Sequence, residues 1–345
     1  MRMSSSLFVA IVAGALCLAS APAFAQHGQD PTPTPESGSP SGSNPTADSV
    51  TEQRLLQQMH KLEGRITIPD YKAAILQQPQ GREYQTFHER ILPWASGLLI
   101  VLMLLALAAF YFTRGRIMLD DGPQTGVKIK RFNVFERLTH WTTATSFIVL
   151  ALTGLNMIFG KRLLFPLIGP DAFSTWSMWA KFAHDTVAWP FILGILSMLI
   201  VWVRDNIPDR YDLRWLREFG GFVSGTHPPA RRFNAGQKLI FWSVVIFGLA
   251  LSVSGVIMLF PFWALDINGM QLMQYVHASA GAILIAIIIA HIYIGTLGMQ
   301  GAYDAMGSGE VDLAWARAHH SLWLEEEHPP VVREGRGGAA GVPAE

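Results

Sequence analysis

Five long apolar stretches limit what this chain can fold into. They cover residues 93–112, 138–159, 184–203, 239–260 and 275–297. Each is close to the roughly 20 mostly apolar residues that a helix needs to cross the hydrocarbon core of a bilayer. Half of the 345 residues are hydrophobic, only 15% are charged, and the formal net charge is zero, which argues against a nucleic-acid-binding protein with a basic surface. We therefore predict an all-α membrane protein with five transmembrane helices.

The N-terminus has the features of an exported protein. Arg2, an apolar run over residues 7–18 and the small-residue sequence "APAFA" predict a signal peptide, residues 1–25, that is cleaved after Ala25. The following residues are rich in Pro, Ser, Thr and Gly, so residues 26–90 are expected to form a partly disordered periplasmic segment. The only cysteine, Cys17, lies in the signal peptide. A mature chain without cysteine excludes disulfides, iron–sulfur clusters and thioether-linked haem, and leaves histidine as the main supply of metal ligands.

The basic residues predict how the spans are oriented. Lys and Arg are concentrated in two connections, residues 113–137 and 204–238, and are absent from the connection between the fourth and fifth spans. Connections rich in Lys and Arg lie on the cytoplasmic side. The mature N-terminus is therefore expected in the periplasm and the C-terminus in the cytoplasm of a bacterial inner membrane protein, in agreement with the signal peptide.

The last span, "QYVHASAGAILIAIIIAHIYIGT", carries a histidine near each end. His277 and His291 are 14 residues apart, which corresponds to about 21 Å along a helix and to faces within about 40° of each other. Two other spans also begin at a histidine, His140 at the cytoplasmic end of the second and His184 at the periplasmic end of the third. Depth therefore pairs His140 with His291 and His184 with His277.

Each pair could hold one iron from two sides, as a bis-histidine b-type haem requires. Helix bundles commonly build such cofactor sites from inward-facing side chains. Gly154 and Gly281 lie on the faces of these histidines, where a glycine lets a porphyrin approach the backbone. A single histidine at the end of a span is more often a hydrogen-bonded interfacial residue, but four at matched depths favour ligation. Six other histidines lack such pairing and are expected on the solvated surface: His60, His88, His227, His319, His320 and His328.

Several motifs together resemble a known family. "RFNVFERLTHW", "NIPDRYDLRW", "RFNAGQKLIFW", "VHASAGAILIAIIIAHIYIG" and "WARAHHSLW" are similar to the cytochrome b, or gamma, subunit of membrane-bound formate dehydrogenase, over about residues 129–323. The N-terminal extension and its extra span make this a longer variant of that subunit. The resemblance implies a four-helix bundle that holds two b haems, with one additional N-terminal transmembrane helix.

The resemblance also implies site residues. The axial ligands would be His140 and His291 for the cytoplasmic-side haem, and His184 and His277 for the periplasmic-side haem. A quinone would bind near the cytoplasmic-side haem at Asn234, Gly236 and Gln237, with His291 close by. Amide side chains suit quinone carbonyls, although Asn234 could equally serve as the N-cap of the fourth span.

The implied function is electron transfer by a subunit that is not itself catalytic. Electrons would come from a periplasmic iron–sulfur (beta) subunit, fed by a molybdenum- or tungsten-containing (alpha) subunit that oxidises formate, and would reach a quinone near the cytoplasmic face. The alternatives are the cytochrome b of another respiratory enzyme, of the hydrogenase or thiosulfate reductase type, and a haem-free membrane anchor.

The expected segments are a signal peptide (1–25), a periplasmic segment (26–90), an extra transmembrane helix (91–113), a cytochrome b domain (114–315) and a cytoplasmic tail (316–345). Four basic residues at the cytoplasmic rim could pair with haem propionates, but most of them are expected to bind lipid phosphates: Arg131, Arg137, Arg204 and Lys238.

Overall fold

The computed structural model describes residues 79–119, 125–221, 225 and 228–329. Its long helices are α4 (Leu92–Arg114), α5 (Val134–Leu163), α6 (Phe165–Trp202), α8 (Ala235–Leu259) and α9 (Ile267–Tyr293). Five helical segments are long and apolar enough to cross a membrane: Gly81–Arg114, Val134–Leu163, Phe165–Trp202, Ala235–Leu259 and Ile267–Gly298. The prediction of an all-α protein with five membrane-spanning helices is confirmed. The predicted signal peptide and most of the predicted periplasmic segment lie outside the described residues.

Short elements join and extend the long helices. α3 (Pro79–Thr86) and the π-helical turn η2 (Phe87–Ile91) lead directly into α4, and η4 (Ile294–Gly298) continues α9. The remaining short elements are α7 (Arg210–Arg217), η3 (Phe219–Gly221), α10 (Asp304–Gly307), α11 (Leu313–His319), α12 (Ser321–Glu327) and the strands β1 (Lys128–Lys130) and β2 (Glu310–Asp312). The strands form a two-stranded antiparallel sheet in which Ile129 is opposite Val311.

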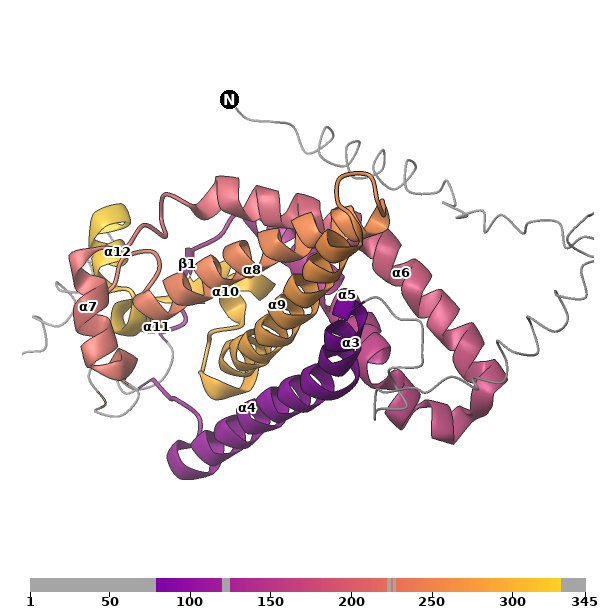
Figure 1. The fold of residues 1–345 in the computed structure, drawn as a ribbon. Helices are drawn as coiled ribbons and strands as arrows, with labels where there is room; N and C mark the ends of the chain where they lie inside the picture. The colour runs from indigo at the N-terminus through magenta and orange to yellow at the C-terminus, as the bar shows by residue number, and fades with distance from the viewer. Residues whose placement is uncertain (1–78, 120–124, 222–224, 226–227, 330–345) are drawn as a thin grey trace, which may run out of the picture. The chain divides into compact units, whose positions relative to one another are not determined.

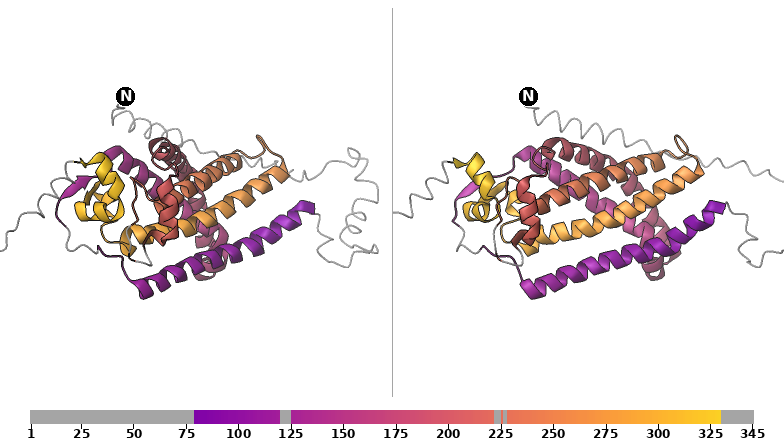
Figure 2. Two further views of the ribbon diagram at one scale, coloured as in Figure 1. Left: turned by 90° about the vertical axis from the view of Figure 1, so that its left-hand side faces the viewer. Right: turned by 60° about the vertical axis from the view of Figure 1, so that its left-hand side comes forward.

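The bundle consists of two helical hairpins and one additional helix. α5 packs along α6 and α8 packs along α9, while α6 and α8 join the two hairpins. α5 and α9 approach each other at only a few positions, and α4 lies along the outer side of α9 (Figure 2). The four-helix bundle with one extra helix therefore matches the predicted architecture.

The described helices extend further than the apolar stretches that predicted them. α6 begins 19 residues before His184, with a sharp bend at Gly169, where φ is +78°, and a second start at Pro170. The helix through α3, η2 and α4 begins before the predicted start of the first span. Hydropathy identifies only the part of a helix in hydrocarbon, whereas backbone hydrogen bonds continue into the interface and beyond it.

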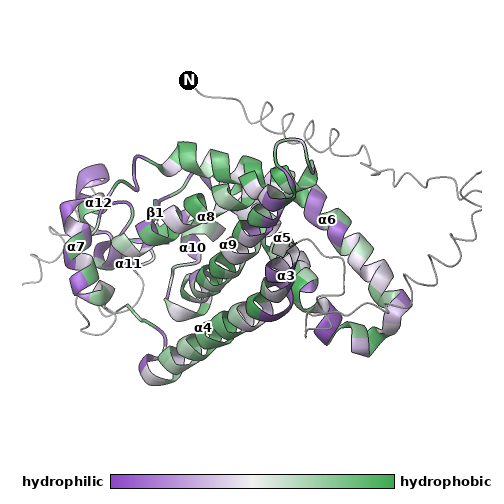
Figure 3. Ribbon diagram, in the orientation of Figure 1, coloured by the Kyte–Doolittle hydropathy of each residue, from purple (hydrophilic) through white to green (hydrophobic). Residues whose placement is uncertain are grey.

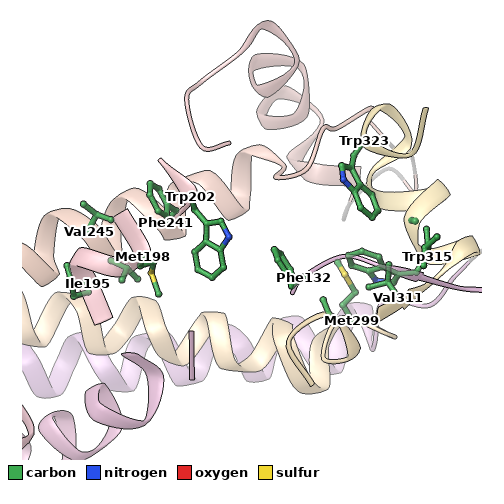
Figure 4. Close-up of a cluster of buried hydrophobic side chains, with 14 of the residues drawn as sticks. Phe132, Ile195, Met198, Trp202, Phe241, Val245, Met299, Val311, Trp315 and Trp323 are labelled. Carbon is green, nitrogen blue, oxygen red and sulfur yellow. The ribbon is translucent and has the colours of Figure 1, made fainter. Parts of the chain in front are cut away.

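The distribution of polarity distinguishes the bundle from one of its ends. Hydrophobic residues predominate along the long helices (Figure 3). On α4 the side chains of Leu98, Leu102 and Leu105 are more than half exposed. α7, α10, α11, α12 and the small sheet gather at the end where α5 and α8 begin (Figure 1). A buried apolar cluster connects this end with the bundle through Ile195, Met198, Trp202, Phe132 and Trp315 (Figure 4).

Asp312 fixes the start of α11 to the segment before β1. Its carboxylate accepts hydrogen bonds from the backbone N–H groups of Ala314, Thr125 and Gly126 and from the Thr125 hydroxyl, at 2.8–3.2 Å. Burial acts to raise the pKa of Asp312, but these donors outweigh it and lower the pKa below the ordinary 3.8. The ionised carboxylate therefore stabilises the fold above pH 3.8, and this contribution is lost as the pH falls through the lower folded-state pKa.

An Asp312→Asn variant is expected to lose about 1–2 kcal/mol of stability near neutral pH, because a capping carboxylate with several donors is replaced by a neutral amide. The difference in stability between the variant and the unmodified chain should become smaller as the pH falls below 3.8, because the native carboxylate also becomes protonated there. Thermal unfolding of the detergent-solubilised proteins between pH 3 and pH 7 measures this difference. Asp304→Asn is the control, since the Asp304 carboxylate makes no hydrogen bond within the described part of the chain. A difference that is constant with pH contradicts the assignment.

Candidate functional site

His140 on α5 lies beside His291 on α9. Their ring centroids are 6.2 Å apart and their planes are inclined by 57°. The Nδ1 atom of His140 is buried and has no hydrogen-bond partner among the described residues. The rings of His140 and the neighbouring Trp141 are nearly perpendicular, with centroids 5.2 Å apart.

His184 on α6 lies beside His277 on α9 in almost the same arrangement. Here the centroids are 6.1 Å apart and the planes are inclined by 60°. Each ring makes a hydrogen bond through Nδ1 with a hydroxyl on a neighbouring helix: His184 with Thr153 at 2.8 Å, and His277 with Ser254 at 3.0 Å. Nε2 is the nitrogen left for other partners in both rings. The structure thus brings together the two pairs that depth along the spans predicts.

The separation of the rings within each pair suits an iron between them. A metal–imidazole bond of about 2.0 Å on each side puts the two nitrogens about 4 Å apart and the ring centroids about 6 Å apart. Both observed separations agree with this value. Among the described residues there is no group of three or more His, Cys, Asp or Glu side chains that could hold a metal ion in the usual protein cage. Paired imidazoles without a third ligand fit the axial positions of a planar macrocycle, because the macrocycle itself supplies the equatorial ligands.

Two glycines leave the helix backbone without a side chain next to His184 and His277. A Cβ atom added at Gly154 would lie 3.6 Å from Cε1 of His184, and one added at Gly255 would lie 3.2 Å from Cε1 of His277. Gly281, which the sequence also suggested, faces Leu251 instead. Gly154 therefore lies beside one of the four candidate ligands, as expected from the sequence, and Gly255 is an equivalent residue that the sequence did not suggest.

The three quinone candidates lie at the first turn of α8. Asn234 and Gln237 form a reciprocal capping box: Asn234 Oδ1 accepts from the Gln237 N–H at 2.9 Å, and Gln237 Oε1 accepts from the Asn234 N–H at 3.1 Å. Both amide oxygens are thus occupied, and neither amide nitrogen makes a hydrogen bond within the described residues. The capping role that the sequence left open is real, and it leaves two NH2 donors free.

A pocket lies next to this turn. It is lined by Trp215, Gly220, Pro228, Asn234, Met299, Ala318 and His319. A Cβ atom added at Gly236 would lie 2.7 Å from the Trp215 ring, so glycine lets the tryptophan close over the turn. His291 does not line this pocket and makes no described contact with Asn234, Gly236 or Gln237. Met299, eight residues after His291 in the chain, does line the pocket.

The expectation that the basic residues at this end mostly bind lipid is wrong for three of the four. Arg131 is buried and donates to the carbonyl of Arg232 at 2.6 Å. Arg137 donates to the carbonyls of Met306, Gly307 and Ser308. Lys238 is 6% exposed and forms ion pairs with Asp209 and Asp212 at 3.2 and 2.8 Å. These pairings join residues far apart in the sequence, so the composition of a connection could not reveal them.

A buried ionic cluster surrounds Glu136, which the sequence analysis did not identify. Glu136 accepts hydrogen bonds from Trp202 at 3.0 Å and from Arg232 at 2.6 Å, and Arg232 also contacts Asp205 at 2.6 Å. Burial opposes the charge of Arg232, but the two carboxylates raise its pKa above the ordinary value. The neighbouring Arg131 has a pKa lowered to about 9 by burial and by the positive charge of Arg232.

His320 is not a surface residue, contrary to the prediction. It is fully buried, and its Nδ1 lies 2.7 Å from the carbonyl of Arg231 while its Nε2 lies 3.0 Å from Arg131. Burial and the charge of Arg131 hold the pKa of His320 well below its ordinary range. α12 carries buried Trp323 and Leu324, so residues 321–327 are part of the folded end. His88 is exposed, as predicted, while His60 and His227 lie outside the described residues.

The chain is similar to several known proteins. A family model described as prokaryotic cytochrome b561 matches residues 131–309, just over half of the chain. The nitrate-inducible formate dehydrogenase cytochrome b556(Fdn) subunit of Escherichia coli (strain K12) is 32% identical over 204 residues, which cover 57% of this chain and 91% of the relative. The formate dehydrogenase cytochrome b556(fdo) subunit of the same organism is 32% identical over 202 residues, 57% of this chain and 92% of the relative. The formate dehydrogenase cytochrome b556 subunit of Haemophilus influenzae is 24% identical over 206 residues, 58% of this chain and 84% of the relative. The resemblance to formate dehydrogenase cytochrome b subunits is thereby confirmed, and the chain belongs to the prokaryotic cytochrome b561 family of integral membrane proteins.

Proposed function

We propose that this chain is the dihaem cytochrome b subunit of a formate dehydrogenase complex, and that it carries electrons through the membrane to a quinone. The observation that supports this most strongly is the pair of matched imidazole sites on one helix, α9, with ring separations of 6.2 and 6.1 Å. Relatives named as formate dehydrogenase cytochrome b556 subunits support the choice of complex. The chain itself is not the catalytic subunit.

In this proposal His140 and His291 hold one b haem, and His184 and His277 hold the other. A bound haem supplies reversible one-electron chemistry at its iron. The protein would contribute the four imidazoles, their fixed orientation and an apolar bundle around them. The 14-residue interval between His277 and His291 separates the two sites by about 21 Å along α9.

The proposed orientation follows from the basic connections. The polar end of the bundle, which includes α7, α10, α11 and α12, lies in the cytoplasm, and the mature N-terminus lies in the periplasm. Residues 1–25 are the signal peptide, 26–90 the periplasmic segment, 91–113 the extra transmembrane helix, 114–315 the cytochrome b domain and 316–345 the cytoplasmic tail. An iron–sulfur subunit delivers electrons on the periplasmic side, from a catalytic subunit that contains molybdenum or tungsten.

Asn234, Gly236 and Gln237 form the proposed quinone site. The free NH2 groups of Asn234 and Gln237 can donate to quinone carbonyls while their oxygens cap α8. The adjacent pocket is lined in part by Asn234. Protons for quinone reduction would come from the cytoplasmic side of the membrane.

Replacing the amides by carboxylates separates the two roles. Asn234→Asp and Gln237→Glu keep the capping oxygens but remove the NH2 donors, so we expect full haem content in both variants. The quinol concentration that gives half-maximal haem reduction should rise by about 2- to 10-fold, which corresponds to the loss of one hydrogen bond. Stopped-flow reduction of the b haems by a soluble quinol measures it. Asn133→Asp, in the equivalent capping box of α5, is the control. An unchanged concentration dependence in both variants contradicts the quinone role.

The function as a whole is tested by purifying the tagged full chain from its native membrane and adding formate. We expect formate to reduce b haem, visible as a sharpened alpha band, with iron–sulfur and molybdenum- or tungsten-containing subunits in the preparation. Reduction by hydrogen but not by formate would identify a hydrogenase-type partner, and reduction of thiosulfate by the quinol-reduced preparation would identify a thiosulfate reductase. An intact chain without haem would show a membrane anchor, and each of these results overturns the proposal.

A further inference from the structure

Two hydroxyl groups support the His184/His277 pair in the same way. Thr153 on α5 is 2.8 Å from Nδ1 of His184, and Ser254 on α8 is 3.0 Å from Nδ1 of His277. Both hydroxyl-bearing residues are buried, with exposed fractions of 9% and 1%. Each hydroxyl reaches across from one helix of a hairpin to the histidine on the other helix.

The hydrogen bonds of these hydroxyls determine which imidazole nitrogen carries the proton. Thr153 Oγ1 lies 2.7 Å from the carbonyl of Val149, and Ser254 Oγ lies 2.6 Å from the carbonyl of Ala250. A carbonyl can only accept, and a hydroxyl has a single hydrogen to donate. The hydroxyl oxygen therefore presents a lone pair to the histidine, so Nδ1 must carry the hydrogen. The Nε2 lone pair of each ring is then available to a metal.

The two hydroxyls occupy equivalent positions of an internal repeat. "RFNVFERLTHW" and "RFNAGQKLIFW" begin at Arg131 and Arg232, 101 residues apart. The same register aligns "TGLNMIF" with "SGVIMLF", and so Thr153 with Ser254 and Gly154 with Gly255. In the structure Arg131 donates to the carbonyl of Arg232, and Arg232 donates back to the carbonyl of Arg131. The chain has thus placed the same hydroxyl–glycine pair against a histidine twice.

The other pair lacks this support. In the repeat, the position equivalent to His140 is Phe241. At the spacing that relates His184 to His277, the position equivalent to His291 is Met198. Phe241 and Met198 belong to the buried apolar cluster (Figure 4). His140 Nδ1 has no hydrogen-bond partner among the described residues. The hydroxyl arrangement is therefore specific to one end of the bundle.

We propose that Thr153 and Ser254 are paired positioning residues that hold His184 and His277 as Nδ1–H imidazoles and lower the reduction potential of the haem at that site relative to the other. This inference rests on the proposed function, since it requires both haems. A hydrogen bond from the second ring nitrogen to an acceptor raises the basicity of a metal-ligating imidazole and fixes its orientation. A more basic ligand favours ferric over ferrous iron, so a haem held by His184 and His277 would have the lower reduction potential. Electron transfer from the His184/His277 side to the His140/His291 side would then be downhill, in the direction that quinone reduction at the α8 turn requires.

The test is a redox titration of the purified, haem-loaded full chain carrying Thr153→Val or Ser254→Ala. We expect each variant to raise the potential of the same one of two haems by on the order of 59 mV, which corresponds to a tenfold change in the preference for ferric iron. The other haem should not change. Thr153→Ser and Ser254→Thr retain the hydroxyl and should keep the original potential.

Matched controls lie nearby on the same helices. Ser252 on α8 and Thr145 on α5 donate to their own helix backbones at 2.7 Å and contact no histidine in the described structure. Ser252→Ala and Thr145→Val should leave both potentials and the haem content unchanged. Loss of one haem in Ser254→Ala, with full retention in Ser254→Thr, also supports the inference, because loss of such a partner commonly weakens metal binding about 10- to 100-fold.

Other results overturn the inference. If both haems keep their potentials in Thr153→Val and Ser254→Ala, or if the controls shift equally, the hydroxyls do not tune the site, while the proposed function stands. If the two variants act on different haems, the pairing of His184 with His277 at one iron is wrong. An unmodified chain without haem overturns the proposed function itself and is recognised before any variant is compared.

Discussion

A His277→Ala chain is expected to retain one haem instead of two. The imidazoles of His277 and His184 face each other at this site, and the described residues form no group of three or more His, Cys, Asp or Glu side chains that could supply a replacement ligand. The other pair should remain loaded, because it lies about 21 Å further along α9. Haem content by the pyridine haemochromogen method, together with the alpha band of the remaining haem, measures the effect.

The pattern across all four histidines makes this prediction specific. His184→Ala should remove the same haem as His277→Ala, and His140→Ala should remove the same haem as His291→Ala. His88→Ala, at an exposed histidine, is the control and should keep both haems. If His184→Ala and His291→Ala proved to remove the same haem, the assignment of the pairs would be refuted.

Replacement of Arg232 by Met is expected to cost about 3–5 kcal/mol of stability, because removing one partner of a buried ion pair leaves the other charge uncompensated. The side chain of Glu136 is only 7% exposed and would lose its cationic partner at 2.6 Å. Asp205 would lose the same partner. Unfolding of the purified chain in mixed micelles with increasing dodecyl sulfate measures the free energy difference.

The neighbouring residue provides a matched control. Arg231 pairs with Glu326 at 3.2 Å, but both side chains are about half exposed, so Arg231→Met should cost no more than about 1 kcal/mol. Adding Glu136→Gln to the Arg232→Met chain should recover part of the loss, since it removes the stranded charge. Equal costs for Arg231→Met and Arg232→Met contradict the importance of the buried cluster.

The parts of the molecule that follow from local sequence were predictable. The apolar stretches identify the five spans, and the interval between His277 and His291 indicates two sites on one face of α9. Asn133 and Asn234 begin their helices with capping boxes that can be recognised from Asn followed three residues later by Glu or Gln.

The parts that depend on contacts between distant segments were not predictable in the same way. Arg131, Arg137 and Lys238 look like lipid-facing cations in a basic connection, yet their partners lie 26–189 residues away. His320 resembles a solvated tail residue but is buried against Arg131. Thr153 and Ser254 differ from these residues, because the repeat that relates them can be recognised in the sequence. Only the structure shows that they contact His184 and His277.

The central claim is that two imidazole pairs each hold one b haem, and the ratio of haem to protein in the purified, unmodified chain tests it most directly. Quantitative amino-acid analysis and the pyridine haemochromogen spectrum of the same sample give this ratio. The account predicts about two b haems per chain, from the two bis-histidine sites. A ratio of one, or an intact folded chain without haem, would contradict it.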